Sequence, residues 1–219
     1  MYKRQDNKFY SNELKQVFDL CVSCKACASE CPSNVDVASL KSEFLYQYKK
    51  ENGAKIRDKA FAFNATLNGL ASKTPSLSNF FFSNKVTSSI LKKGLGVAEE
   101  RSLPLVSKLS FEKWIQTFLK NNKVVNPIKE VYFFIDEFTN YLDTHVGIDA
   151  VELLTALNYK VIFVKHKPSG RALLSKGFLD EVIPYIDGNV SLFSNLISEN
   201  KKLIGVEPSA ILSLSLIHI

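Results

Sequence analysis

Residues 131–135 read Val-Tyr-Phe-Phe-Ile, a continuous apolar run typical of a strand that is buried on both faces of a sheet. Two similar runs follow at 161–164 (Val-Ile-Phe-Val) and 203–206 (Leu-Ile-Gly-Val). Helices are predicted around them, through residues 151–157, 172–178 and 190–198. Strands that alternate with helices indicate a parallel α/β sheet with right-handed connections and helices on both faces.

The beginning of the chain has a different character, because residues 20–36 (LCVSCKACASECPSNVD) contain every cysteine. A helix is predicted directly after this run, since apolar residues recur there at helical spacing and Ser33, Asn34 or Asp36 can cap its start. Asn52-Gly53 is a typical helix end. Short helices broken by turns are predicted beyond it, and we expect residues 80–82 (Phe-Phe-Phe) to be buried beneath the cysteine module.

Composition and charge argue against several functions. The 28 Lys and Arg against 22 Asp and Glu give a net charge of +6, but the basic residues form scattered pairs, as on solvated helix faces. We therefore expect no nucleic-acid partner. The polar N-terminus does not suggest a signal peptide, and no apolar run reaches the about 20 residues of a membrane-spanning helix. Clustered cysteines in such a chain indicate metal binding in a reducing compartment, so we expect a cytoplasmic protein, with peripheral attachment to the inner membrane left open.

Cys21, Cys24, Cys27 and Cys31 have the spacing C-x2-C-x2-C-x3-C-P, in which Pro32 turns the chain away. Thiols at such short intervals let one loop wrap a face of an iron–sulfur cube, as in bacterial ferredoxins. Structural zinc sites generally use two cysteine pairs about a dozen or more residues apart, and a redox-active Cys-x-x-Cys needs only two thiols. We therefore predict a [4Fe–4S] cluster, with zinc as the alternative.

The spacing alone leaves open whether this chain supplies the whole ligand set. In two-cluster proteins the fourth cysteine of such a run binds the other cluster, and a distant cysteine completes the local one. The chain has 4 cysteines in all. Either Cys31 closes the local site, or the missing ligand belongs to other polypeptide.

The cysteine run and the helix after it resemble the second ferredoxin-type cluster of flavin-linked 2-hydroxyacid dehydrogenases, the relatives of D-lactate dehydrogenase, glycolate oxidase and 2-hydroxyglutarate dehydrogenase. Later motifs continue the resemblance in order: residues 100–104 (ERSLP), 136–143 (DEFTNYLD), 169–177 (SGRALLSKG) and 205–209 (GVEPS). In long members of this family, FAD-binding domains precede two iron–sulfur clusters and a cysteine-rich "CCG" domain. The resemblance implies that Cys21, Cys24 and Cys27 bind the local cluster and that Cys31 belongs to the neighbouring one.

The expected fold class is α+β to α/β. It comprises a small all-α ferredoxin-like iron–sulfur module at 1–53, a helical connecting region at 54–126, a partial parallel α/β domain of CCG type at 127–213, and a non-native tail at 214–219. We assign no function to His218 in that tail.

Several departures from the family pattern limit what is expected of this chain. The flavin domains are absent, so we expect a truncated fragment that does not turn over substrate by itself. Residues 167–171 (Lys-Pro-Ser-Gly-Arg) stand where CCG domains place paired cysteines. His166 beside this loop is interpreted as a loop histidine without a role rather than as a ligand. Asp136, Glu137 and Asp143 are interpreted as loop-capping carboxylates, and no catalytic residue is predicted.

The resemblance implies the electron-transfer part of an oxidoreductase that acts on CH–OH donors. Electrons would pass from reduced FAD through the clusters to a quinone or an electron-transfer protein. The partners would be a FAD-binding domain or subunit, a second cluster segment and that acceptor. Two alternatives stay open: a stand-alone iron–sulfur subunit similar to heterodisulfide-reductase or lactate-utilisation proteins, and a zinc-stabilised interaction module without catalysis.

Overall fold

The computed structural model describes residue 9, residues 11–24 and residues 26–216, with the backbone alone at 215 and 216. The chain divides into two compact units that do not follow the order of the sequence. The first unit contains the described residues up to Phe63 together with Arg171–Ile183. The second contains Asn64–Gly170 and the described residues from Pro184 onward.

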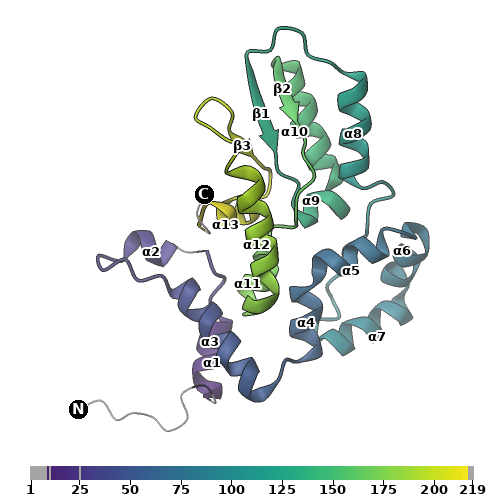
Figure 1. Ribbon diagram of the computed structural model, residues 1–219. Coiled ribbons are helices and arrows are strands. Elements are labelled where there is room, and N and C mark those ends of the chain that lie inside the picture. Colours follow the sequence, from purple (N-terminus) through teal and green to yellow (C-terminus); the bar gives the residue numbers. More distant parts are fainter. Residues whose placement is uncertain (1–8, 10, 25, 217–219) are drawn as a thin grey trace. The chain divides into compact units, whose positions relative to one another are not determined.

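The described part of the first unit is built from helices (Figure 1). They are α1 (Asn12–Asp19), α2 (Ala26–Glu30), α3 (Val37–Asn52), α4 (Ile56–Ala62), α11 (Arg171–Ser175) and the beginning of α12 (Leu179–Phe193). Helix α3 starts where the sequence predicts, because the Asp36 carboxylate accepts a hydrogen bond from the Ser39 backbone N–H. It ends at Gly53, whose φ of 75° lies in the left-handed region. The predicted helix is therefore confirmed at both ends.

The core of the first unit joins α3 to residues 171–178. Leu45 of α3 is buried, as are Leu173 and Phe178. Gly177 allows this close approach, since a Cβ atom there would lie 2.6 Å from the Leu45 Cβ. Its φ of +64° is also one that other residues rarely adopt. Segments far apart in the sequence thus form one core.

The second unit contains a three-stranded parallel sheet in the order β2-β1-β3. The strands are β1 (Lys129–Phe133), β2 (Tyr159–Ile162) and β3 (Leu203–Ile204). Val131 of β1 pairs with Val161 of β2, and Tyr132 pairs with Leu203 of β3. The predicted parallel sheet between helices is confirmed.

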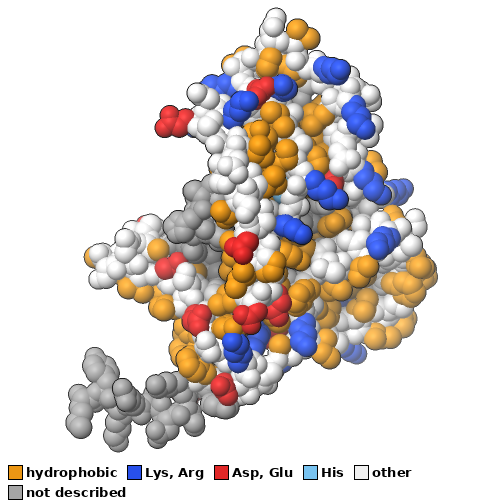
Figure 2. All heavy atoms as spheres, viewed as in Figure 1, with side chains coloured by type: hydrophobic (Ala, Val, Ile, Leu, Met, Phe, Trp, Pro, Cys, Tyr) orange, Lys and Arg blue, Asp and Glu red, His pale blue; other side chains and the backbone are white. Residues whose placement is uncertain are grey.

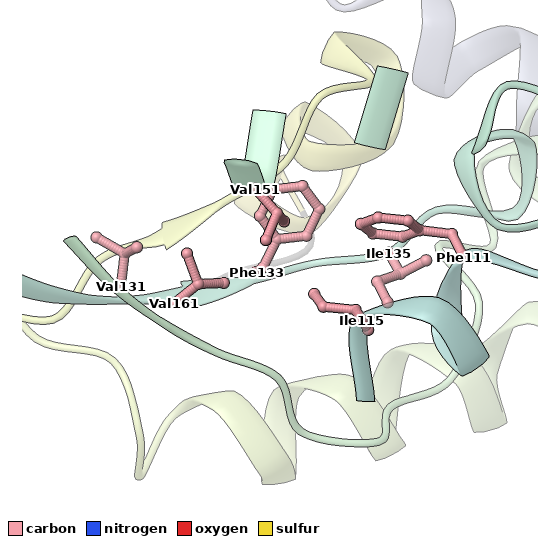
Figure 3. Close-up of a cluster of buried hydrophobic side chains, with 7 residues drawn as sticks. All are labelled: Phe111, Ile115, Val131, Phe133, Ile135, Val151 and Val161. Atoms are coloured by element: carbon pink, nitrogen blue, oxygen red, sulfur yellow. The ribbon is translucent and has the colours of Figure 1, made fainter. Parts of the chain in front are cut away.

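Side chains of β1 and the residues after it alternate between the two faces of the sheet. On one face, helices α8 (Phe111–Asn121) and α10 (Thr144–Ala156) pack against the strands, as Figure 3 shows. The buried cluster there consists of Phe111, Ile115, Val131, Phe133, Ile135, Val151 and Val161. Burial of each large apolar side chain contributes about 1.5–3 kcal/mol, so this cluster is a main source of the unit's stability.

The opposite face is covered by α12 and α13 (Pro208–Leu216). Phe134 packs there with Phe193, Ala210 and Leu214. Burial on both faces explains why the strands are continuously apolar. Leu214 is the first residue of the segment predicted to be a non-native tail, whereas His218 and the rest of 217–219 lie outside the described residues.

Several element boundaries differ from the prediction, among them the start of α10 at Thr144 rather than 151. Strand β1 begins and ends two residues earlier than 131–135, because Phe134 and Ile135 are buried after the strand ends. The last helix before β3 was expected at 190–198, but α12 spans Leu179–Phe193. Pro184 lies inside α12, and a proline within a helix usually argues against one.

Helices α5 (Asn64–Ala71), α6 (Pro75–Ser83), α7 (Lys85–Leu95) and α9 (Glu137–Tyr141) complete the second unit. Figure 2 shows hydrophobic side chains gathered over α6 and α7. Phe80 is 58% exposed and Phe81 44%, so the expected burial of these phenylalanines is wrong. The two rings instead pack edge to face, with centroids 5.8 Å apart. Across the described residues, no helix is long and apolar enough to cross a bilayer.

Candidate metal centre

The four cysteines lie on and around the short helix α2. Cys21 and Cys24 precede it, Cys27 lies within it and Cys31 follows it directly. All four are free thiols. Cys24 is exposed, whereas the other three are half-buried. No group of three or more His, Cys, Asp or Glu side chains in the described residues is gathered closely enough to hold a metal ion. The structure therefore does not bring the predicted ligands together into a formed site.

Backbone N–H groups nevertheless point at the sulfur atoms. The Ser23 N–H donates to the Cys21 Sγ at 3.4 Å, and the Val37 N–H donates to the Cys27 Sγ at 3.3 Å. Ser23 reaches this position with a φ of 56°, in the left-handed region. Hydrogen bonds to ligand sulfurs are among the factors that tune iron–sulfur clusters.

Cys31 has the same kind of surroundings. The backbone N–H of Val35, followed by those of Ser33 and Asn34, lowers the pKa of the Cys31 thiol. The turn is closed by the Asn34 N–H, which donates to the Cys31 carbonyl at 2.9 Å. A thiol held in this way is prepared for ionisation.

The Ser23 hydroxyl is a polar group of the cysteine loop whose hydrogen-bonding capacity is not used by the described residues. Its oxygen is buried and has no hydrogen-bond partner within the described part of the chain. A buried hydroxyl without a partner is costly, so the loop has an unused donor beside the cysteines. The thiol donor set, its N–H donors and this hydroxyl all fit a thiolate-ligated metal group, although the thiols are not gathered.

Two basic side chains hold the loop between α1 and α2. The Lys41 Nζ of α3 donates to the Cys21 carbonyl at 2.5 Å. The Arg171 guanidinium of α11 donates to the carbonyls of Val22 at 3.3 Å and Ser23 at 3.2 Å. Lys41 is only 7% exposed, and burial, opposed by the nearby Cys21, lowers its pKa.

Sequence reasoning missed both of these residues. Lys41 lies on the helix face that also carries the buried residues Ala38, Phe44 and Leu45. A lysine at an apolar-face position is a signal that could have been noticed. Arg171 is 148 residues from Ser23 in the sequence, so no local pattern connects the two.

The second unit contains the other residues that the sequence singled out. His166 is stacked on Phe134 with ring centroids 4.2 Å apart. Its Nε2 accepts a hydrogen bond from the Ile135 N–H at 3.0 Å, which places the proton on Nδ1, 2.8 Å from the Lys167 carbonyl. Burial lowers the pKa of His166. Both ring nitrogens are thus engaged within the second unit, so His166 has a structural part there, and the prediction that it is not a ligand stays a prediction.

The carboxylates near the end of β1 have different roles. Asp136 caps α9 by accepting hydrogen bonds from the N–H groups of Phe138 and Thr139, so its predicted capping role is confirmed. Asp143 stands at the N-cap of α10 without a side-chain capping bond, and the prediction of capping is wrong there.

Glu137 binds a loop, as predicted, because its buried carboxyl accepts hydrogen bonds from Ser169 in the loop before α11. The Ser169 Oγ lies 2.9 Å from both carboxyl oxygens, and the Ser169 N–H donates at 3.2 Å. Burial raises the pKa of Glu137. A cavity of about 140 Å³ opens beside it, lined also by Glu112, Asn140 and His166.

Comparisons with known proteins give the chain its nearest functional context. It is 29% identical over 220 residues to D-2-hydroxyglutarate dehydrogenase of Haemophilus influenzae. This alignment covers 96% of the present chain and 21% of the Haemophilus protein. It is 26% identical over 212 residues to D-2-hydroxyglutarate dehydrogenase of Escherichia coli, and this alignment covers 93% of the present chain and 20% of the Escherichia coli protein. No protein family model and no solved structure matches the chain. The chain therefore spans about a fifth of the length of the curated relatives that it matches.

Proposed function

We propose that this chain is the iron–sulfur, electron-transfer segment of a D-2-hydroxyacid dehydrogenase. The observation that carries the proposal is the four-cysteine run in a chain whose similarity to proteins named D-2-hydroxyglutarate dehydrogenase extends over 96% and 93% of its length. Free thiols with N–H donors directed at Cys21 and Cys27 support it.

The proposal divides the work between this chain and the remainder of the enzyme. A FAD-binding domain or subunit would oxidise the CH–OH group of a 2-hydroxyacid, and 2-hydroxyglutarate is the substrate that the names of the relatives suggest. This segment would then relay electrons towards a quinone or an electron-transfer protein. It contributes no catalytic residue to substrate oxidation under this proposal.

Within this chain, the cysteines would hold the cluster as thiolates. Cys21, Cys24 and Cys27 would bind the local [4Fe–4S] cluster, and Cys31 would bind a neighbouring one or close the local site. The cluster supplies one-electron transfer when it is bound. The N–H groups of Ser23 and Val37 orient the sulfurs of Cys21 and Cys27, and such hydrogen bonds help to set a reduction potential.

Anaerobic reconstitution with ferrous iron and sulfide tests the proposal. The expected product is a brown protein whose colour is bleached by dithionite and whose reduced form gives a paramagnetic resonance signal. A protein that stays colourless and binds one zinc ion instead would support the interaction-module alternative. A protein that takes up neither metal would refute both.

Ligand variants separate the two arrangements for Cys31. Cys24→Ser is expected to abolish the cluster, whereas Cys31→Ser should spare it when upstream polypeptide supplies the remaining ligand. Ser29→Ala is the matched control, since Ser29 is exposed on α2 and its hydroxyl donates only to the Ala26 carbonyl of the same helix. Equal loss of iron in both cysteine variants, in a longer chain that includes the upstream part, would refute the two-cluster assignment.

A further inference from the structure

We infer that Lys41 and Arg171 form a cationic clamp on the cysteine loop, and that their positive charges favour the reduced state of the cluster bound there. The inference rests on the proposed function. It names two positioning residues that act on the cluster through the loop.

The clamp is defined by three consecutive backbone carbonyls. The Cys21 carbonyl accepts from the Lys41 Nζ, and the carbonyls of Val22 and Ser23 accept from the Arg171 guanidinium. The two cations come from different helices, α3 and α11, and both belong to the first unit. The two cations thus bind all three backbone carbonyls of the stretch from Cys21 to Ser23, which precedes the predicted ligand Cys24.

The carbonyls and the sulfur-directed N–H groups belong to the same short loop. While its carbonyls point to the cations, the Ser23 N–H points to the Cys21 sulfur. A carbonyl that accepts from a cation polarises its peptide and strengthens the N–H donor of that peptide. The peptide between Val22 and Ser23 has both bonds, because the Val22 carbonyl accepts from Arg171 and the Ser23 N–H donates to sulfur. The clamp therefore acts on the sulfur through one peptide unit as well as through space.

The burial of Lys41 strengthens the electrostatic effect of its charge on the cluster. The ammonium of a lysine residue that is only 7% exposed is screened less by water and salt than that of a surface lysine. Lys176 adds a further positive charge near Lys41, and Asp19 opposes it. A cluster held by thiolates is an anion that becomes more negative by one charge on reduction. Fixed cations beside it stabilise the reduced form more than the oxidised form.

The charge can be separated from the structural role by paired variants. Lys41→Met removes the charge and keeps an unbranched apolar stem, whereas Lys41→Arg keeps the charge. Arg171→Gln keeps a hydrogen-bond donor without charge, whereas Arg171→Lys keeps the charge. If the clamp acted only by holding the loop, Arg171→Gln would behave like the wild type.

Lys50→Met is the matched charge control. Lys50 is exposed on the same helix as Lys41. It lies nine residues further along, which corresponds to about 13 Å on a helix axis. That separation exceeds the Debye length of about 8 Å at physiological ionic strength, so removing its charge should leave the cluster unaffected.

The experiment is a potentiometric titration of the anaerobically reconstituted full chain, with the reduced fraction read by paramagnetic resonance. At a fixed potential, Lys41→Met and Arg171→Gln should each lower the reduced-to-oxidised ratio about tenfold, which is about 59 mV for a one-electron couple. Lys41→Arg, Arg171→Lys and Lys50→Met should stay within about twofold of the wild type.

Each other result has a defined meaning. A loaded wild type whose ratio is unchanged in both charge-removing variants refutes the clamp and leaves the proposed function intact. If Lys41→Met loads no cluster, loading of Lys41→Arg to the wild-type level supports the clamp, and equal failure of Lys41→Arg overturns it. A wild-type chain that takes up no iron refutes the proposed function, and the clamp fails with it.

Discussion

Lys49 is a buried cation whose replacement by methionine should stabilise the first unit. Its Nζ is buried without a hydrogen-bond partner among the described residues and lies 4.2 Å from the centroid of the Phe178 ring. Burial lowers the pKa of Lys49 to about 8, an effect that Asp58 opposes. The folded state therefore disfavours the charged amine, although Lys49 is charged in both the folded and the unfolded chain at neutral pH.

The size of the effect follows from three contributions. A fall in pKa from 10.5 to about 8 corresponds to about 3 kcal/mol, at roughly 1.4 kcal/mol for each pH unit. Water screens roughly half of this cost, because the rest of the side chain is partly exposed. Attraction to the Phe178 ring returns about 0.5–1 kcal/mol. Lys49→Met should therefore stabilise the first unit by about 1 kcal/mol at pH 7.

The advantage of methionine should depend on pH. Below pH 8 the lysine is charged in both states, so the folded state bears the full cost of burying the charge. As the pH rises from about 8 to 10.5, the folded state loses the proton first and the cost disappears. The free-energy difference between variant and wild type should accordingly be largest near neutrality and vanish in strong alkali.

Hydrogen exchange of peptides from α3 is a suitable measurement, because Lys49 lies in that helix. At pH 7 the variant should exchange about fivefold more slowly than the wild type, as about 1 kcal/mol requires. Comparison at equal pH cancels the intrinsic exchange rate. An advantage that persists undiminished at pH 10, or faster exchange in the variant at pH 7, would refute the reasoning.

Three further substitutions have defined consequences for stability. Gly177→Ala should destabilise the first unit by at least about 1–2 kcal/mol in urea unfolding, since its φ is +64° and the new Cβ would lie 2.6 Å from the Leu45 Cβ; a midpoint equal to the wild type would contradict this. Ser169→Ala should lower the thermal stability of the second unit by about 1–3 kcal/mol, because it removes the hydroxyl donor of the buried Glu137 carboxyl and leaves the backbone N–H of residue 169 in place, and Ser169→Thr, which keeps a hydroxyl, is the comparison. Asp136→Ala should cost about 1–2 kcal/mol through the lost cap of α9, whereas Asp136→Asn should cost less, and equal losses would argue against capping.

The sheet could be predicted from the sequence because burial on both faces leaves a visible pattern. Residues 131–135 and 161–164 are continuously apolar, and each lies within two residues of an observed strand. The ends of the strand were displaced, since β1 spans Lys129–Phe133 although Phe134 and Ile135 beyond it are buried as well. Pro184 obscured α12, since local propensity could not reveal a helix that tertiary packing maintains.

The candidate site could be predicted only in part. Cysteine spacing is a local signal, and it pointed to Cys21, Cys24, Cys27 and Cys31 as ligands, an assignment that stays a prediction. Lysines were interpreted as solvated helix faces, which was wrong for Lys41 and for the Nζ of Lys49. Whether a lysine on a helix is buried depends on what packs against the helix.

One boundary between the two units falls between Gly170 and Arg171. The roles of Ser169 and Arg171, which lie on either side of it, can therefore be tested separately. Ser169 supports a buried carboxyl in the second unit, whereas Arg171, two residues later, holds the cysteine loop of the first. If each side chain acts only within its own unit, Ser169→Ala should weaken the second unit and leave the cluster potential unchanged. Arg171→Gln should change that potential and leave the environment of Trp114, in the second unit, unaltered. Crossed effects would mean that this segment couples the units energetically, and the clamp could then not be described by its local hydrogen bonds alone.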